Sequence, residues 1–194
     1  MMVELVEHWG SDKLIANIAS LSYGYKESKN PENLINKLLE KGHTSVFEFA
    51  GATFYVETSI IVQRQWMRHR HLSYLEQSLR YIRHPVVKMQ LQDERLGSDE
   101  VKLLIDDIVN KSAETYEELL KKGIAPELAR AVFPLGMRTR FYVSGNLRSW
   151  LQFLELRLAP DAQYEIRYEA QQVLQLLSGK FPLTLNAWRR QHAY

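Results

Sequence analysis

The chain has 194 residues, of which 45% are hydrophobic and 25% are charged, and its formal net charge is only +2. This composition suits one globular domain with a substantial core, so we expect residues 1–194 to fold as a single domain. The chain has no cysteine, which excludes disulfides, thiolate metal sites and cysteine nucleophiles. The N-terminus lacks the pattern of a signal peptide, and no apolar stretch approaches the ~20 residues that span a bilayer. We therefore expect a cytoplasmic protein that binds neither membrane nor, at so small a net charge, nucleic acid.

Helix caps and glycines divide the first third of the chain into short elements. Residues 2–6 alternate in polarity, which predicts a β-strand. Ser11 and Asn30 are capping residues, and the apolar residues after each of them recur at helical spacing until Gly24 and Gly42. The other elements expected here are a polar turn at 43–48, a strand at 53–58 and a short helix at 60–67.

The rest of the chain is predicted to be mainly helical. The expected elements are a long helix at 98–123, a short helix at 125–130, a strand at 139–144, and helices at 146–158 and 161–181. One stripe of the long helix collects its apolar residues: Val101, Leu104, Ile105, Ile108, Tyr116, Leu119 and Leu120. After Pro182 we expect a loose, basic tail. Because strands and helices do not alternate strictly, we predict an α+β fold in which a small, mostly antiparallel sheet is flanked by helices.

Basic residues are concentrated in one stretch, from Gln65 to Tyr81. Between Arg64 and Arg83 the sequence has five arginines and two histidines but a single carboxylate, Glu76. Arginine and serine side chains match phosphate oxygens, so we interpret the stretch as a polyanion site for a phosphorylated small molecule, with a solvated basic loop as the alternative. Large apolar residues between the charges favour a packed segment whose arginines face a cleft: Trp66, Met67, Leu72, Tyr74, Leu75, Leu79 and Tyr81.

Three later arginines are further candidates. Arg130 could bind an anion or be an ordinary surface charge. Arg148 and Arg157 are nine residues apart on one predicted helix, so they project to nearly opposite sides at ~3.6 residues per turn. Gln152 falls on the first of these sides and Asn146 near the second. This helix could separate two ligand sites, or it could be an ordinary helix at an edge of the fold.

The central stretch resembles the signature of the flavin-dependent thymidylate synthases. Its matching residues are Arg68-His69-Arg70, then seven intervening residues and Ser78, with Glu76 and Arg80 beside it. The resemblance extends along nearly the whole chain. His43, Ser45 and Glu48 are similar to the family's His-x-Thr-x-x-Glu flavin segment, with serine in place of threonine. The further matches are Ser22, Gln65, Arg130, Asn146, Arg148 and Arg157, and the stretch at 162–167, which we interpret as structural.

Carried onto this sequence, the resemblance implies two ligands. Bound FAD would contact Ser22, His43, Ser45, Glu48, Arg68, His69, Arg70, His71, Glu76, Asn146, Arg148 and Gln152. Bound dUMP would contact Gln65, Arg68, Glu76, Gln77, Ser78, Arg80, Arg130 and Arg157. The resemblance further implies a homotetramer whose active sites are shared between subunits, and no metal.

The reaction that the resemblance implies is methylation of dUMP at C5 to form dTMP. Methylenetetrahydrofolate would supply the carbon, and NADPH would reduce the flavin. Arg157 is the expected catalytic residue, because a guanidinium beside the uracil ring stabilises negative charge that develops there. Ser78 has no evident base, so we expect it to bind nucleotide and not to act as a nucleophile. The sequence departs from common family residues at Leu75 and Gln152, two positions that vary within the family.

Three other functions compete with this interpretation. The same basic stretch could belong to a nucleic-acid-binding module, which would bind with a steep dependence on salt. His69, His71 and His84 could belong to a metal hydrolase, although the neighbouring arginines would repel a cation. A protein similar to the family could also bind flavin and nucleotide without transferring a methyl group.

Overall fold

The computed structural model describes residues 1–82 and 97–192, and it confirms the predicted α+β class. Four antiparallel strands form one sheet in the order β1-β2-β4-β3. The strands are β1 (Met2–Trp9), β2 (Gly51–Ser59), β3 (Ser73–Glu76) and β4 (Arg138–Asn146). The helices are α1 (Asp12–Leu21), α2 (Pro31–Glu40), α3 (Ile60–Trp66), α4 (Asp99–Lys121), α5 (Pro126–Ala129), α6 (Leu147–Arg157), α7 (Tyr164–Ser178) and α8 (Pro182–His192), with short 3-10 helices η1 (Ser45–Phe49) and η3 (Arg130–Val132).

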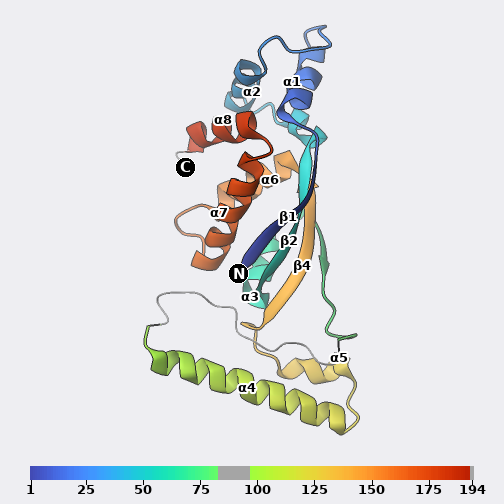
Figure 1. Ribbon diagram of the computed structural model, residues 1–194, viewed down its shortest axis with the longest axis vertical. Helices are drawn as coiled ribbons and strands as arrows, with labels where there is room; N and C mark the ends of the chain where they lie inside the picture. Colours follow the sequence, from blue (N-terminus) through green and yellow to red (C-terminus); the bar gives the residue numbers. More distant parts are fainter. Residues whose placement is uncertain (83–96, 193–194) are drawn as a thin grey trace.

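The helices cover one face of the sheet and extend beyond both of its ends. In Figure 1, α6 and α7 lie along one side of the sheet, α1, α2 and α8 gather at one end, and α4 crosses the other end. Strands β2 and β4 are paired along their full length, from Gly51 opposite Asn146 to Ser59 opposite Arg138. Their inward-facing side chains are fully buried and form the centre of the core: Phe54, Val56, Phe141 and Val143.

Strand β3 was not predicted, although it lies inside the central basic stretch. Its alternation runs against the usual pattern, because Leu75 points outward and is 72% exposed whereas Tyr74 and Glu76 are half-buried. An edge strand needs only one partner, and backbone pairing with β4 holds it whatever the polarity of its side chains. The interpretation of the stretch as a packed segment is partly confirmed, since Trp66 and Leu72 are buried but Met67 and Tyr81 are exposed.

The expectation of a loose C-terminal tail is wrong, because residues 182–192 form helix α8. Pro182 occupies the first turn, where a proline favours a helix start, and Trp188 is only 2% exposed. Buried Asp12, at the start of α1, accepts hydrogen bonds from the backbone nitrogens of Leu183 (2.7 Å) and Thr184 (3.1 Å). It also accepts one from the Thr184 hydroxyl (2.6 Å), so this carboxylate caps a helix that is distant in sequence.

Helix α4 is confirmed, but the first half of its apolar stripe is largely uncovered in one protomer. Leu104 is 62% exposed and Ile108 is 64% exposed. The buried positions lie nearer the end of the helix, where Tyr116 packs against Phe133 with ring centroids 4.6 Å apart. In the part of the chain that the structure describes, no helix is both long enough and apolar enough to cross a membrane.

We predict that Asp12→Ala destabilises the protein by about 2–3 kcal/mol, because three buried or half-buried donors lose a charged acceptor. Urea unfolding, followed by circular dichroism, measures this change. The matched control is Glu32→Ala, which removes an exposed carboxylate 3.8 Å from Arg190 and should cost less than about 1 kcal/mol. Equal midpoints for Asp12→Ala and the wild type would contradict the assigned cap.

Candidate functional site

The basic loop between α3 and β3 is held by buried side chains at both ends. At the start, the Trp66 indole donates to Glu169 Oε2 (2.6 Å) and its ring stacks on Phe153, with centroids 4.2 Å apart. At the end, Leu72 packs over Gly145, where a Cβ atom would come within 2.2 Å of Leu72 Cδ2. The glycine is therefore required for this close approach. Between the two anchors the loop is rigidly placed, and most of its charged side chains face outward.

Arg68, Arg70 and His71 are the exposed basic residues of this loop. Among residues 1–82 and 97–192, neither arginine forms a salt bridge. Unpaired guanidinium groups on a fixed backbone suit an anionic ligand, because no internal carboxylate must first be displaced. The loop can therefore bind phosphate in the way that the sequence predicts, although its arginines point to an open surface in one protomer.

Arg157, at the end of α6, meets two uncharged acceptors. Its Nε donates to His69 Nε2 (2.9 Å), and its Nη2 donates to the backbone carbonyl of Gln65 (2.9 Å). His69 must therefore be neutral, with its proton on Nδ1. Burial, and secondarily the positive charge of Arg157, lower the pKa of His69 to about 4. Burial also lowers the pKa of Arg157. The site thus contains a guanidinium whose hydrogen bonds do not neutralise its charge.

Arg148 lies on the opposite side of α6 from Arg157, as predicted, and three cavities meet at its side chain. The first, of about 540 Å³, is lined by Ser22, Tyr23, His43, Thr44, Ser45 and Arg148 among others. The second, of about 390 Å³, is lined by Glu48, His71, Asn146, Arg148, Ser149 and Gln152. The third, of about 360 Å³, lies between α2, α6 and α8, and shares Gln152 and Arg148 with the second. Most of the residues predicted to bind FAD are therefore brought together around one arginine.

Two details of this cluster were not predicted. Arg148 Nη1 is 2.6 Å from Glu48 Oε1, so two expected flavin ligands pair with each other. Asn146 lies on the Arg148 side, contrary to the expectation from helical spacing. It precedes the helix in an extended conformation, where it caps α6 by accepting from the Ser149 nitrogen (2.9 Å), so the helical angle per residue does not apply to it.

Four of the eight residues expected to contact dUMP form a second group between the end of β3 and α5: Gln77, Ser78, Arg80 and Arg130. Arg80 is paired with the Glu127 carboxylate (3.3 Å), and Arg130 Nε donates to the Glu127 carbonyl (3.1 Å). The Gln77 side chain accepts from Arg140 Nε (2.6 Å), and the Ser78 hydroxyl accepts from the backbone nitrogen of Arg80 (3.3 Å). The two predicted arginines thus converge on one residue.

Glu76 is turned toward the interior and not toward the arginines. Its carboxylate accepts from Gln63 Nε2 (3.1 Å) and from the Thr139 hydroxyl (2.5 Å). Neither donor was predicted, and neither has a sequence signal beyond lying beside a strand end. Glu76 was expected to contact both ligands, and here it joins β3 to α3 and β4.

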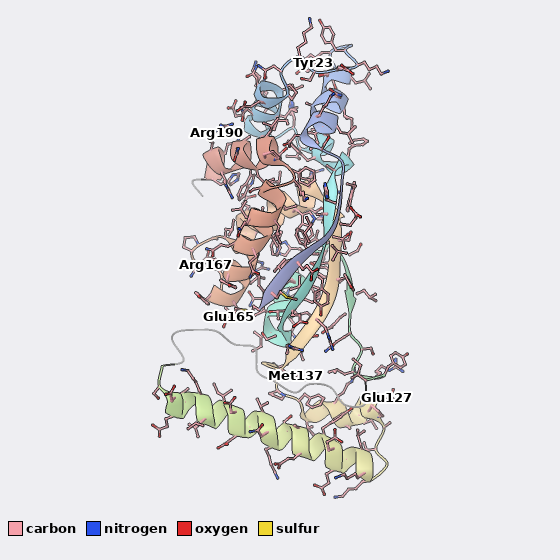
Figure 2. All side chains as sticks on the ribbon, viewed as in Figure 1. Tyr23, Glu127, Met137, Glu165, Arg167 and Arg190 are labelled. Atoms are coloured by element: carbon pink, nitrogen blue, oxygen red, sulfur yellow. The ribbon has the colours of Figure 1, made fainter. Side chains whose placement is uncertain are left out.

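We call the residues that line the three cavities at Arg148 the flavin group, and the residues around Glu127 the α5 group. The two groups lie toward opposite ends of the protomer. Figure 2 shows Tyr23, which lines the largest cavity at Arg148, near one end, and Glu127 near the other. The interpretation of a metal site is not supported among the described residues, where no three His, Asp or Glu side chains could hold a metal ion. His84, which that interpretation also used, lies outside the described residues.

We predict that His69 stays neutral between about pH 5 and 8, since its pKa is about 4. Histidine nitrogen shifts measured by NMR, with His69→Gln to assign the signal, test this expectation. In Arg157→Ala the pKa should rise, because a nearby positive charge is removed, but it should stay below the usual value because burial is the larger cause. A wild-type His69 that titrates near its ordinary value of ~6.5 would contradict the geometry.

Comparison with known proteins gives one consistent result. The model of the family described as thymidylate synthase complementing protein matches residues 4–183. The chain is 38% identical to the flavin-dependent thymidylate synthase of Thermosipho africanus, over 96% of this chain and 90% of that one. It is 35% identical to that of Thermus thermophilus, over 96% and 73%. The structure of the UMP/dUMP methylase PolB from Streptomyces cacaoi, bound with 5-Br dUMP, superposes with a TM-score of 0.90 at 28% identity, covering 97% of this chain and 94% of that one. The chain therefore belongs to the family of the flavin-dependent thymidylate synthases.

Proposed function

We propose that this protein methylates dUMP to dTMP, with FAD as cofactor, methylenetetrahydrofolate as carbon donor and NADPH as reductant. The observation that carries the proposal is the environment of Arg157. Its guanidinium is fixed by the neutral His69 ring and the Gln65 carbonyl, and neither acceptor cancels its charge. Such a group can stabilise the negative charge that develops on a pyrimidine ring when C5 reacts. Arg157 is therefore the proposed catalytic residue.

The side chains around Arg148 fit a flavin dinucleotide. A pyrophosphate needs a cation and hydroxyl or imidazole donors, which Arg148, Ser45 and His43 provide at one cavity. The two adjoining cavities give room for the rest of an extended cofactor. When bound, the flavin supplies the hydride, and the chain binds and orients it. The proposed FAD-binding residues are those named from the sequence: Ser22, His43, Ser45, Glu48, Arg68, His69, Arg70, His71, Glu76, Asn146, Arg148 and Gln152.

The cations near α5 and in the basic loop suit the phosphate of dUMP. Arg80 and Glu127 are both about half exposed, with side-chain exposures of 55% and 50%, so their pairing contributes little and a phosphate can replace the carboxylate. Ser78 has a phosphate-compatible hydroxyl beside Arg80 and is assigned to binding. The proposed nucleotide-binding residues are Gln65, Arg68, Glu76, Gln77, Ser78, Arg80, Arg130 and Arg157.

A homotetramer with shared active sites completes the proposal. Figure 2 shows Tyr23, which lines a cavity at Arg148, and Glu127, which pairs with Arg80, toward opposite ends of one protomer, so the proposal brings the two ligands together between copies of the chain. Leu104 and Ile108 on α4, together with Leu75 and Tyr142 on the outer face of the sheet, are 48–72% exposed. Exposed apolar surfaces of this kind favour contact with further copies of the chain. Residues of one copy can then meet the ligand groups of another.

The first test is the visible absorption spectrum of the purified protein, before and after dUMP is added. We expect flavin bands that shift with dUMP, because the two ligands lie side by side. Arg157→Ala should keep the flavin bands and lose at least about 100-fold in methylation, since a charge-stabilising donor is removed. Arg190→Ala, an exposed arginine on α8, is the matched control and should keep near-wild-type turnover.

Two results would overturn the proposed function. A colourless protein that cannot be reconstituted with FAD would remove the cofactor, and nucleic-acid binding with a steep salt dependence would then be tested. Wild-type turnover in Arg157→Ala would remove its catalytic role. A protein that binds flavin and dUMP but forms no dTMP would be the family-like binder without methyl transfer.

Assembly has its own test. Leu104→Asp places a charge in the exposed apolar stripe of α4, so we expect it to convert the tetramer into smaller species in light scattering coupled to gel filtration. Asn110→Asp, a similar change on the opposite side of α4, should leave the tetramer intact. A wild-type monomer with full activity would contradict shared active sites.

A further inference from the structure

We propose that Glu169 is a positioning residue for the reaction, which fixes Trp66 and, through the end of α3, the two acceptors that hold Arg157. This inference rests on the proposed function, because it assigns a second residue to the same site. Glu169 does not touch either ligand group. It lies on the inner face of α7, and its side chain is fully buried.

The two oxygens of the Glu169 carboxyl group differ in their hydrogen bonding. Its Oε2 accepts from the Trp66 indole at 2.6 Å. Its Oε1 is buried and accepts no hydrogen bond of good geometry among the described residues, although the Thr58 hydroxyl lies where it acts on the carboxyl group as a donor. The Gln172 amide nitrogen is also buried without a partner among those residues. A glutamine could hold Trp66 equally well, so what distinguishes a carboxyl group at this buried position is that it can ionise.

A short chain of contacts links Glu169 to the catalytic arginine. The Trp66 ring, held by Glu169, stacks on Phe153, and Phe153 contacts the His69 ring edge-on with centroids 4.9 Å apart. The Trp66 backbone follows Gln65 directly, and the Gln65 carbonyl accepts from Arg157. Both acceptors of Arg157 are thus set by the position of one indole ring. Displacing the indole ring would therefore move the His69 ring and the Gln65 carbonyl together. Small displacements at a reacting centre lower the reaction rate strongly.

Burial favours the neutral form of the Glu169 carboxyl group, and it is the main cause that raises the pKa of Glu169 to about 7. The Thr58 hydroxyl on β2 and the Trp66 indole on α3 act on the carboxyl group as hydrogen-bond donors and lower its pKa, but neither carries a charge. The charged groups that act on it are the Met1 ammonium, just before β1, which lowers the pKa, and Glu165 on α7, which raises it. Ionisation therefore places a buried charge beside Trp66 that neutral donors compensate only in part.

We therefore expect activity to fall at alkaline pH because Glu169, a residue outside the ligand sites, ionises. Below the pKa, the neutral carboxyl keeps Trp66 and Arg157 in place. Above it, the charge must draw in solvent or shift α7, so the single-turnover rate of dUMP methylation falls as pH rises through the pKa. Binding of FAD should change less than the rate, because the proposed FAD residues around Arg148 lie on the other side of α6 and only those in the basic loop, such as His69, are close to Trp66.

The experiment compares single-turnover rates of the FAD-loaded full chain with saturating dUMP, from about pH 6 to 9. Glu169→Gln keeps an acceptor for Trp66 and a donor in place of the proton, but cannot ionise. We expect it to retain at least about half of the wild-type rate at the acid end and to lack the alkaline decline near pH 7. Glu169→Leu removes the acceptor and should lower the rate about 10-fold or more at every pH, with FAD affinity within about threefold. Glu32→Gln on α2, an exposed carboxylate, should match the wild type throughout.

A second variant keeps the inference testable if Glu169→Leu does not fold. Trp66→Phe keeps a ring in the core but removes the indole donor, so its rate should fall at the acid end by a larger factor than its dUMP affinity, because Gln65 and Arg157 supply only part of the proposed nucleotide contacts. The positioning role is overturned if Glu169→Gln shows the wild-type alkaline decline, or if Trp66→Phe has the wild-type rate. These outcomes differ from failure of the proposed function, in which the wild-type protein itself binds no flavin or forms no dTMP.

Discussion

The charge of Arg157 is preserved because both of its acceptors are uncharged, and much of the surrounding structure serves this arrangement. A carboxylate would hold the guanidinium more strongly but would cancel its field at the ligand. The His69 ring can accept only while it lacks a second proton, and burial with the nearby positive charge keeps its pKa at about 4, so the acceptor persists at neutral pH. The Gln65 carbonyl is available because it lies in the last turn of α3, where carbonyls lack an intrahelical partner four residues on.

Strand β4 runs directly into helix α6, so the sheet fixes the positions of the arginines on both sides of that helix. Asn146 ends the strand and caps the helix, so Arg148 and Arg157 are carried on a single rigid element that begins at the sheet. Trp150 Nε1 donates to the backbone carbonyl of Gly145 (2.9 Å), which fixes the helix on the strand. The same glycine admits Leu72 and so locates the basic loop. Two segments that are far apart in sequence, the basic loop and the junction of β4 with α6, therefore meet at a position where a larger residue would clash.

The sequence predicts those parts of the fold that depend on local patterns. The central strands and helix α6 were expected close to their observed bounds, because their apolar residues follow one period and their caps are strong. Strand β3 was missed because its backbone pairing outweighs an inverted polarity, and α8 was missed because its cap comes from Asp12, 170 residues earlier in sequence. The candidate ligand residues were named from residue type and spacing and stay a prediction, whereas partners such as Glu127 and Glu169 are joined to them only by tertiary packing. Glu169 did carry a signal, because it and Glu165 are carboxylates at helical spacing on a face of α7 whose other buried residues are apolar.

Burial separates the contacts that a ligand can exchange from those that must stay. The pairs Arg80–Glu127 and Arg148–Glu48 have side-chain exposures of 45–55%, and ion pairs at that exposure contribute about 0–1 kcal/mol. A phosphate can therefore take either arginine from its carboxylate at small cost. The contacts of Arg157 and Trp66 are more deeply buried, and breaking them would leave polar groups without partners. The protein thus has two cations, Arg80 and Arg148, that a ligand can take from their carboxylates, and one, Arg157, that is fixed in place. Ligand binding needs cations of the first kind, and charge stabilisation needs one of the second.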